Sequence, residues 1–399
     1  MSCNRRQLST MEQPAWELLR QRLRAVRNFL SVALPIANAH TGDFYTRGVW
    51  DELVCSSPEA VLAAFTRHHP PEQLNHTEPT RSWDENELLK IFCKASHRLV
   101  DLESFLEAAK HHSLPYLGVC TPLGQLLGFL NEEEHNNYDK KITTDEFMNY
   151  KKAHEVLVMS QLIDSIANYC GIKQDSIMVG LHTCGDLSPN TLRIFVGKPE
   201  IKAVCSVGCC YHLLSEEFEV QPEENTVEKW GFPMCQDLKE ERWSCGRNAR
   251  MSACLALDRV AVGQGLPLES LFYRAVLQVI VKECYGNVKS DRRVGKAFSK
   301  SSCFLDYCRE SLKNLGLDES KLSDSRLIEY YEMYKSRKKE LEAFNMLRVV
   351  LSPCIEALIL LDRLCYLREQ GNVAWSGLVK LFDPVKSPRC YAVIAVKKY

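Results

Sequence analysis

Two short apolar runs, separated by a segment long enough for one helix, constrain the fold of this chain more than any other feature. Residues 176–181 and 201–207 have the length and the nearly continuous apolar character of strands covered on both faces of a parallel sheet. Between them, Ser188 and Pro189 form a typical helix start, with an N-capping hydroxyl and a first-turn proline. The segment therefore predicts a strand–helix–strand unit with a right-handed crossover, and an α/β fold.

The pattern divides the chain into two parts. Residues 1–130 show amphipathic helical spacing and predict a helical N-terminal domain. Residues 131–143 are polar and acidic, offer little to a hydrophobic core, and predict a linker. Residues 144–399 then form a second domain that contains the predicted sheet.

In this second domain a long helical insertion interrupts the strands. The insertion is expected at about 248–369, and the predicted strands lie near 177–181, 201–207, 378–382 and 391–396. The last two strands flank a proline-containing turn and should form an antiparallel pair that closes the sheet. Charged residues and Pro353 interrupt the apolar stretch 351–367, so it predicts a buried core helix, restarted at Ser352 and Pro353, rather than a membrane span.

Composition and charge are those of an ordinary intracellular protein. The 399 residues, 45% of them hydrophobic, suffice for a sizeable core. With 50 Lys and Arg against 51 Asp and Glu, the balanced charge argues against a nucleic-acid partner, without excluding one, and against a membrane surface. The N-terminus lacks the apolar region of a signal peptide, so a cytoplasmic or nuclear location is expected, with the 18 cysteines mostly reduced.

Two segments rich in reactive side chains directly follow the first two predicted strands. They are HTCGD at 182–186 and GCCYH at 208–212. Adjacent parallel strands lie about 4.8 Å apart and end at the same edge of a sheet, where ligands bind, so these segments should share one rim. There, His182 or Asp186 would orient or deprotonate the group to be modified. The candidate catalytic residues are His182, Asp186, Cys209, Cys210 and Tyr211, and His212 is a candidate for substrate binding.

A substrate pocket competes with two alternatives. Small Gly and Cys residues at strand ends also allow helices to pack closely, without any chemical role. A zinc site would use Cys184, Cys209, Cys210 and His212. The sequence has no C-x-x-C or H-x-x-x-H pair near these residues, however, so no metal site is predicted.

Basic side chains elsewhere are candidates for holding an anionic group. Lys152 and His154 lie on the helix that leads into the sheet. Arg247 and Arg250, three residues apart near a helix start, suit fork-type contacts with a carboxylate or phosphate and are candidate substrate-binding residues. A solvated charged face and structural ion pairs are the competing interpretations of these residues.

Six segments, spread over nearly the whole chain, resemble the methyltransferase-like protein 25 family. They are ANAHTGDFY (37–45), FMNYKKAHEV (147–156), GLHTCGDL (180–187), SVGCCYH (206–212), GRNARMSA (246–253) and FDPVKSPRC (382–390). The resemblance implies an S-adenosylmethionine-dependent methyltransferase with a Rossmann-like sheet in the order 3-2-1-4-5-7-6, strand seven antiparallel. It assigns 177–181 to strand four, 201–207 to strand five, and the C-terminal pair to strands six and seven.

The sequence departs from this family where the cofactor would bind. The resemblance implies three further strands before strand four, with a glycine-rich loop after the first, whereas here Gln174 runs directly into Asp175. That loop and an acidic residue after strand two would hold the cofactor. No intact cofactor-binding residues are therefore predicted, and Lys152, His154, Cys184 and Gly185 are possible remnants. The expected fold is a partial class I methyltransferase sheet with strands 4-5-7-6.

Two classes of function follow. The first is an S-adenosylmethionine-dependent methyltransferase family member, with RNA, protein or a small molecule as the unknown acceptor, whose activity is impaired in this alternative or truncated gene product. The second is a catalytically inactive pseudoenzyme that recruits a protein partner or a second copy through the exposed edge of strand four. A partial sheet also buries less apolar surface, so a third expectation is an unstable product.

Overall fold

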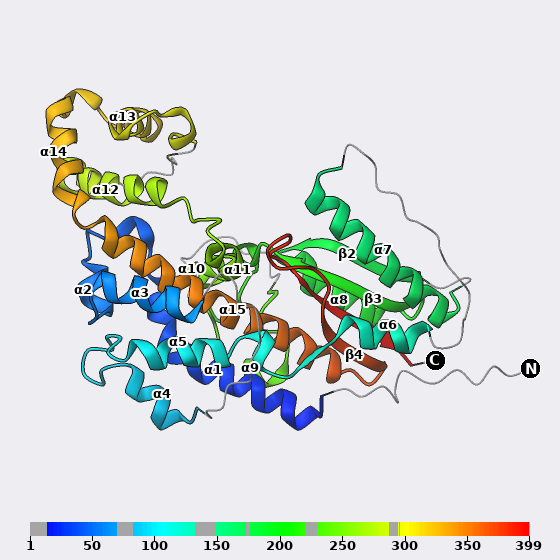
Figure 1. The fold of residues 1–399 in the computed structure, drawn as a ribbon. Helices are drawn as coiled ribbons and strands as arrows, with labels where there is room; N and C mark the ends of the chain where they lie inside the picture. The colour runs from blue at the N-terminus through cyan, green and yellow to red at the C-terminus, as the bar shows by residue number, and fades with distance from the viewer. Residues whose placement is uncertain are drawn as a thin grey trace, which may run out of the picture.

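The structure is a computed structural model that describes residues 14–69, 83–131, 148–172, 176–219, 230–286, 294 and 296–398. Figure 1 shows a helical part next to an α/β part, with the long helix α15 (Lys338–Arg368) running from one to the other. Of the predicted linker at 131–143, only Asn131, the last residue of α6 (Leu123–Asn131), lies within the described residues.

The N-terminal part consists of short helices with sequence-encoded starts. Ser57 caps α3, Asp84 forms a capping box with Glu87 at α4, and Asp101 caps α5. One face of the first helix is buried, and this helix and α3 pack against α15. The elements are α1 (Trp16–Asn38), η2 (Thr41–Asp43), α2 (Val49–Leu53), α3 (Pro58–His68), α4 (Glu85–Ile91), α5 (Leu102–His111) and η3 (Leu114–Tyr116).

The α/β part holds a five-stranded sheet in the order β1-β4-β5-β3-β2. Its strands are β1 (Cys120–Thr121), β2 (Ser176–Cys184), β3 (Ile201–Cys209), β4 (Val373–Lys380) and β5 (Tyr391–Lys397). The strand β5 is antiparallel to both of its neighbours, and all other pairs are parallel. The two-residue strand β1 comes from the N-terminal part and was not predicted, because a run this short has no periodicity to detect.

Helices cover both faces of the sheet. The Sγ atom of Cys205 contacts Met159 of α7 (Tyr150–Cys170), whereas the hydroxyl of the next residue, Ser206, lies 3.4 Å from that of Ser188 in α8 (Leu187–Gly197). Successive side chains of a strand point to opposite faces. The helices α7 and α8 therefore lie on opposite sides of β3, and α15 packs on the same side as α8.

The remaining elements connect β3 to β4. They are η4 (Tyr211–Leu213), α9 (Gln236–Glu240), α10 (Arg247–Ser252), α11 (Leu257–Ala261), α12 (Leu268–Tyr285), η5 (Phe298–Lys300), α13 (Phe304–Leu315), η6 (Glu319–Lys321) and α14 (Asp324–Lys335), followed by α15. Figure 1 shows that α12, α13 and α14 project away from the sheet.

Two details of the C-terminal part differ from the sequence expectation. The strand β4 begins at Val373 and ends at Lys380, earlier than the predicted 378–382, because the segment around Ser376 and Gly377 pairs fully with β5 although it is not strongly apolar. The helix α15 also continues through Pro353 instead of restarting there. Proline removes one helical hydrogen bond, but the burial of nearly every neighbouring side chain outweighs this cost.

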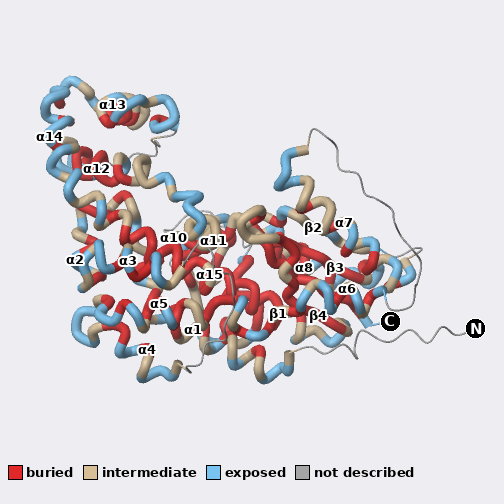
Figure 2. Tube along the Cα trace, in the orientation of Figure 1, coloured by how far each residue is buried: buried red, intermediate tan, exposed pale blue. Residues whose placement is uncertain are grey.

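The core is centred on α15. This helix is long and apolar enough to cross a membrane by length and composition, but 94% of its most apolar window is buried inside the protein. Figure 2 shows the buried residues concentrated along α15 and the adjoining strands. Helices and sheet thus share one continuous hydrophobic core.

A buried carboxylate on α15 fixes the segment before α9. Asp362 is fully buried and accepts hydrogen bonds from the backbone N–H groups of Met234 at 2.9 Å and Cys235 at 2.8 Å. Burial raises the pKa of Asp362 to about 6, because the charged form loses its hydration.

This raised pKa should make stability pH-dependent. The folded state binds the Asp362 proton more tightly than the unfolded chain, so the resulting stabilisation is complete below the unfolded pKa of 3.8 and is lost as the pH rises through about 6. Between pH 4 and 7 the free energy of unfolding of the wild type should fall by about 2 kcal/mol relative to that of Asp362→Asn, which cannot titrate. Urea unfolding of both proteins measures this difference, and two parallel pH profiles would contradict it.

Candidate functional site at the carboxyl edge of the sheet

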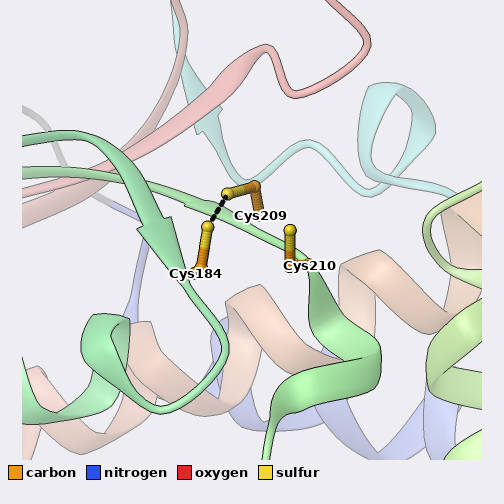
Figure 3. Close-up of side chains that lie close together, drawn as sticks. All are labelled: Cys184, Cys209 and Cys210. Carbon is orange, nitrogen blue, oxygen red and sulfur yellow. Dashed lines mark hydrogen bonds between the residues drawn. The ribbon is translucent and has the colours of Figure 1, made fainter.

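Three cysteines meet where β2 and β3 end. The register pairs Cys184 with Cys209, and the backbone N–H of Gly185 donates to the carbonyl of Cys209 at 3.0 Å. The Sγ atoms of Cys184 and Cys209 are 3.0 Å apart, and both lie within 4.8 Å of the Sγ atom of Cys210 (Figure 3). The sequence correctly indicated that the two segments share a rim, because parallel strands place their carboxyl ends together.

The backbone after each strand turns sharply. Gly185 has a φ of +50°, and a Cβ atom there would lie 2.6 Å from the carbonyl oxygen of Leu213. Cys210 also has a positive φ, 51°, which is uncommon for a residue with a side chain and is held here between β3 and η4. The two turns contact each other through Gly185 and Leu213, so each fixes the conformation of the other.

The protein environment keeps two of these thiols protonated. Burial raises the pKa of the Cys209 thiol well above its usual value, and the neighbouring Cys184 and Cys210 raise it further. Burial and the contact with Cys184 likewise raise the pKa of Cys210. Since the thiolate is the nucleophile, Cys209 and Cys210 are poor nucleophiles at neutral pH unless a cation compensates their charge.

Tyr211 lies beneath this rim. It is only 1% exposed, and its hydroxyl donates to Oε1 of Glu356 at 2.8 Å. The same oxygen accepts a hydrogen bond from Nη1 of Arg389 at 3.1 Å. Burial raises the pKa of Tyr211 well above its usual value, so the hydroxyl stays a hydrogen-bond donor. The burial of Tyr211 and its hydrogen bond to Glu356 indicate a residue that positions the Cys210 turn.

A second polar group lies where α7 meets the end of β2. His182 is exposed, and its Nε2 lies 3.8 Å from Oε2 of the buried Glu155. Glu155 accepts a hydrogen bond from the hydroxyl of Ser387 at 2.6 Å and pairs with Lys151 at 3.5 Å. Neither Glu155 nor Ser387 was predicted as a site residue from the sequence, although both lie in segments that resemble the methyltransferase-like family.

The cofactor remnants proposed from the sequence do not form one site. The Nε2 atom of His154 accepts a hydrogen bond from the backbone N–H of Asp383 at 3.4 Å, which ties α7 to the turn before β5. The side chain of Lys152 is exposed. Cys184 and Gly185 instead belong to the rim described above.

Of the remaining candidates, Asp186 and Arg250 hold loops in place. Oδ1 of Asp186 accepts the backbone N–H of Ser215 at 2.8 Å. Arg250 is buried and pairs with Glu219 at 2.5 Å and Glu216 at 3.3 Å. In this structure the Arg250 guanidinium is engaged by these two carboxylates and shielded from solvent, which favours the structural ion pair as the interpretation of this residue.

The other two substrate-binding candidates are Arg247 and His212. Arg247 is exposed at the start of α10. The Nδ1 atom of His212 lies 3.6 Å from the Sγ atom of Cys254. Neither residue has a contact that assigns it to a substrate.

A cavity of about 150 Å³ opens farther along the same edge of the sheet. It lies at the end of β4 and the start of β5. Residues from the N-terminal part, α11, α15 and the C-terminal turn line it. Its charged and polar walls include Tyr116, Asp258, Glu356, Lys380 and Arg389. Glu356 and Arg389 connect this cavity to Tyr211 and hence to the cysteine rim. The sequence could not reveal the cavity, because four distant segments build it.

Known proteins resemble this chain in the segments that form the rim. A family model described as a methyltransferase domain matches residues 130–217, which include α7, β2, α8 and β3. The probable methyltransferase-like protein 25 of Homo sapiens is 42% identical, over 96% of this chain and 98% of that protein. The Mus musculus protein of the same name is 41% identical over the same shares. No solved structure matches the chain.

The alignments also show a difference in length. The alignment with the human protein extends over 591 positions, which exceeds the 399 residues of this chain by 192. At least that many aligned positions of the human protein therefore have no counterpart here. Because the alignment covers 98% of that protein and 96% of this chain, most of the difference lies within the aligned region and not beyond its ends.

Proposed function

The chain belongs to the family of probable methyltransferase-like protein 25, and we propose that it keeps the acceptor side of a methyltransferase domain without the side that binds the methyl donor. The observation that carries this proposal is the position of β2. Among the described residues β2 pairs with β3 alone, and it follows α7 after a short connection from Gly171 to Ser176.

The strand arrangement supports this proposal. We assign β2, β3, β5 and β4 to strands four, five, seven and six of a class I methyltransferase sheet. Their observed order and the antiparallel direction of β5 are consistent with this assignment. The strand β1 then extends the sheet beyond strand six, and strands one to three would lie beyond β2, where the described residues contain no strand.

The residues present do not fit the methyl donor. Methyltransferase domains in general use S-adenosylmethionine, and in Rossmann-like sheets the cofactor lies against a glycine-rich turn that follows the first strand. The outer edge of β2, where that strand would pair, has no neighbour in the described part of the chain. We infer that the aligned positions absent from this chain include the donor-binding strands, so no catalytic step through the donor is assigned to it.

By contrast, this chain contains a cavity on the side of the sheet where we expect the acceptor to bind. The cavity beside β4 and β5 has both polar and apolar walls, and its volume of about 150 Å³ is enough for a small functional group of an acceptor. Lys380, Asp258 and Glu356 in its wall favour a polar or charged group over an apolar one. The Glu356 carboxylate, held between Tyr211 and Arg389, would orient this group towards the rim.

A methyl-transfer assay tests this proposal. Purified chain would be incubated with radiolabelled S-adenosylmethionine and cell extract as the source of acceptor, next to a version that carries the additional segment of the human protein after Gln174. Labelling of an acceptor by the extended version alone is expected. Labelling by the chain as it stands would contradict the proposal.

A second candidate function rests on the free edge of β2. Val179 is 45% exposed, and Ile177, Met178 and Leu181 are half-buried on the same strand. A long apolar edge strand is a template for strand addition, and natural proteins usually block such edges with charge. We propose that a chain without donor-binding strands pairs this edge with β2 of a second copy, which would make it an interaction protein.

Self-association through β2 should depend on Val179. Light scattering after size-exclusion chromatography is expected to show a concentration-dependent dimer for the wild type and a monomer for Val179→Lys, because a lysine on an edge strand disfavours strand pairing. Val100→Lys is the matched control, since Val100 is 46% exposed but lies outside the sheet. A wild type that stays monomeric at every concentration would rule out this function.

A further inference from the structure

The cysteine rim, formed by Cys184, Cys209 and Cys210, has the composition of a metal site, although the spacing of these residues in the sequence does not indicate one. Structural zinc motifs are normally recognised by paired cysteines a few residues apart, and this chain has no such pair here. The parallel register instead brings Cys184 next to Cys209, and Cys210 follows in sequence. Among the described residues, no other group of three His, Cys, Asp or Glu side chains comes this close together.

We propose that Cys184, Cys209 and Cys210 bind one Zn²⁺ ion as three sulfur ligands, with the fourth coordination position open. Three thiol protons leave as three Zn–S bonds form, so no oxidant or reductant is needed. The site and its test are independent of whether the chain binds a methyl donor.

The geometry of the three sulfurs suits this ion. Zn–S bonds of about 2.3 Å in a tetrahedral arrangement place sulfurs about 3.8 Å apart. The observed sulfurs lie within 4.8 Å of one another, and the closest pair is 3.0 Å apart. A small rotation of the half-exposed Cys184 side chain would even out these distances. Thiolate ligands also favour zinc over hard cations such as Mg²⁺ or Ca²⁺.

The surroundings distinguish this cluster from simple packing. A cysteine that only fills a core is normally fully buried, as Cys205 is in β3, whereas Cys184 and Cys210 are half-exposed. An ion can therefore reach the cluster from solvent. The Nδ1 atom of the nearby His212 already lies 3.6 Å from Cys254, so the fourth position is left to a water molecule or an acceptor group.

A zinc ion at this place would also stabilise the attachment of β2 to the sheet. Among the described residues the strand β2 has a neighbour on one side only, and its pairing with β3 is irregular between Gly180 and Thr183. Bonds from Cys184 and Cys209 to one ion would join the two strands at their ends. Zinc binding should therefore raise the unfolding temperature and protect β2 from hydrogen exchange.

Zinc titration of the whole chain tests the site. The reduced chain would be stripped of metal with a chelator and titrated with Zn²⁺ against a chromophoric competitor. One tightly bound ion per chain is expected, with slower reaction of Cys184 and Cys210 with a thiol reagent and with thiolate-to-cobalt charge-transfer absorption after Co²⁺ replacement. Cys184→Ser and Cys210→Ser should each weaken zinc binding by more than about 100-fold, since even outer-shell changes cost about 10–100-fold.

The control is Cys303→Ser, which removes an exposed cysteine distant in sequence and should leave binding unchanged. Cys184 and Cys210 are half-exposed, so both variants should keep the circular dichroism of the metal-free wild type, which separates loss of binding from loss of fold. Absence of tight binding, binding that survives both substitutions, or a Cys184–Cys209 disulfide in the protein isolated from cells would each overturn the proposal.

Discussion

Glu356→Ala is expected to lower the free energy of unfolding by about 3–5 kcal/mol, the usual cost of removing one partner from a buried ion pair. Glu356 is buried in α15 and accepts hydrogen bonds from Tyr211 and Arg389. Without this carboxylate, the Tyr211 hydroxyl, which belongs to a side chain only 1% exposed, loses its acceptor. The Arg389 guanidinium also loses its charge partner, although it keeps the carbonyl groups of Ala253, Cys254 and Leu255.

A second variant at Glu356 separates the effect of its charge from that of its packing, and a variant at Glu342 serves as the control. Glu356→Gln keeps an oxygen for Tyr211 and removes only the charge, so it should cost about 1–3 kcal/mol, less than alanine. Glu342→Ala, on the same helix but without a buried partner network, should stay within about 0.5 kcal/mol of the wild type. Equal losses for the Glu356→Ala and Glu342→Ala variants in urea unfolding would show that Glu356 does not hold the rim and the cavity together.

Gly185→Val should have the second large effect. The φ of +50° disfavours any β-branched residue, and the new Cβ would lie 2.6 Å from the backbone oxygen of Leu213, which cannot move without shifting η4. Backbone strain and overpacking each cost about 1–3 kcal/mol, so a total loss of about 2–6 kcal/mol is expected. The two turns that present Cys184 and Cys210 should separate.

The matched control for this substitution is Gly197→Val at the end of α8. Gly197 has ordinary backbone geometry, and no atom lies within 4 Å of its added Cβ. This change should leave the free energy of unfolding within about 1 kcal/mol of that of the wild type. Faster reaction of Cys209 with a thiol reagent in Gly185→Val, but not in Gly197→Val, would locate the damage at the rim. Equal stability of the two variants would contradict the contact between the turns.

The parts of the fold that the sequence revealed are those with strong local signals. The runs 176–181 and 201–207, with Ser188 and Pro189 between them, predicted parallel strands that end at one edge. The structure has both strands, and their register brings Cys184 to Cys209. Local periodicity and capping carry this information, so no knowledge of distant segments was needed.

The parts that the sequence missed depend on distant segments. Glu356 and Arg389 meet Tyr211 from 145 and 178 positions away, and the two-residue strand β1 pairs with β4 across most of the chain. The ion pairs of Arg250 were missed for the same reason, because Glu216 and Glu219 are 34 and 31 residues away and nothing in the local pattern marks them as its partners. Spacing in the chain likewise argued against a metal site that three converging sulfurs now support.

Within the described ranges β2 has one edge that no strand pairs with, and this edge connects these observations. In a sheet with strands on both sides of β2, the apolar residues around Val179 would be covered, and the cysteine rim would face a neighbouring loop. Here the ends of β2 and β3 form the rim, and α15 and the C-terminal strands contribute to the cavity, without such a neighbour among the described residues.

The most direct test is calorimetric titration of purified, monodisperse chain with S-adenosylmethionine, next to the version that carries the human protein's additional segment after Gln174. We expect no saturable heat from the chain as it stands, even at millimolar ligand, and saturable one-to-one binding by the extended version. Saturable binding of S-adenosylmethionine by the unextended chain would show that another part of the molecule holds the donor, and would contradict the central claim.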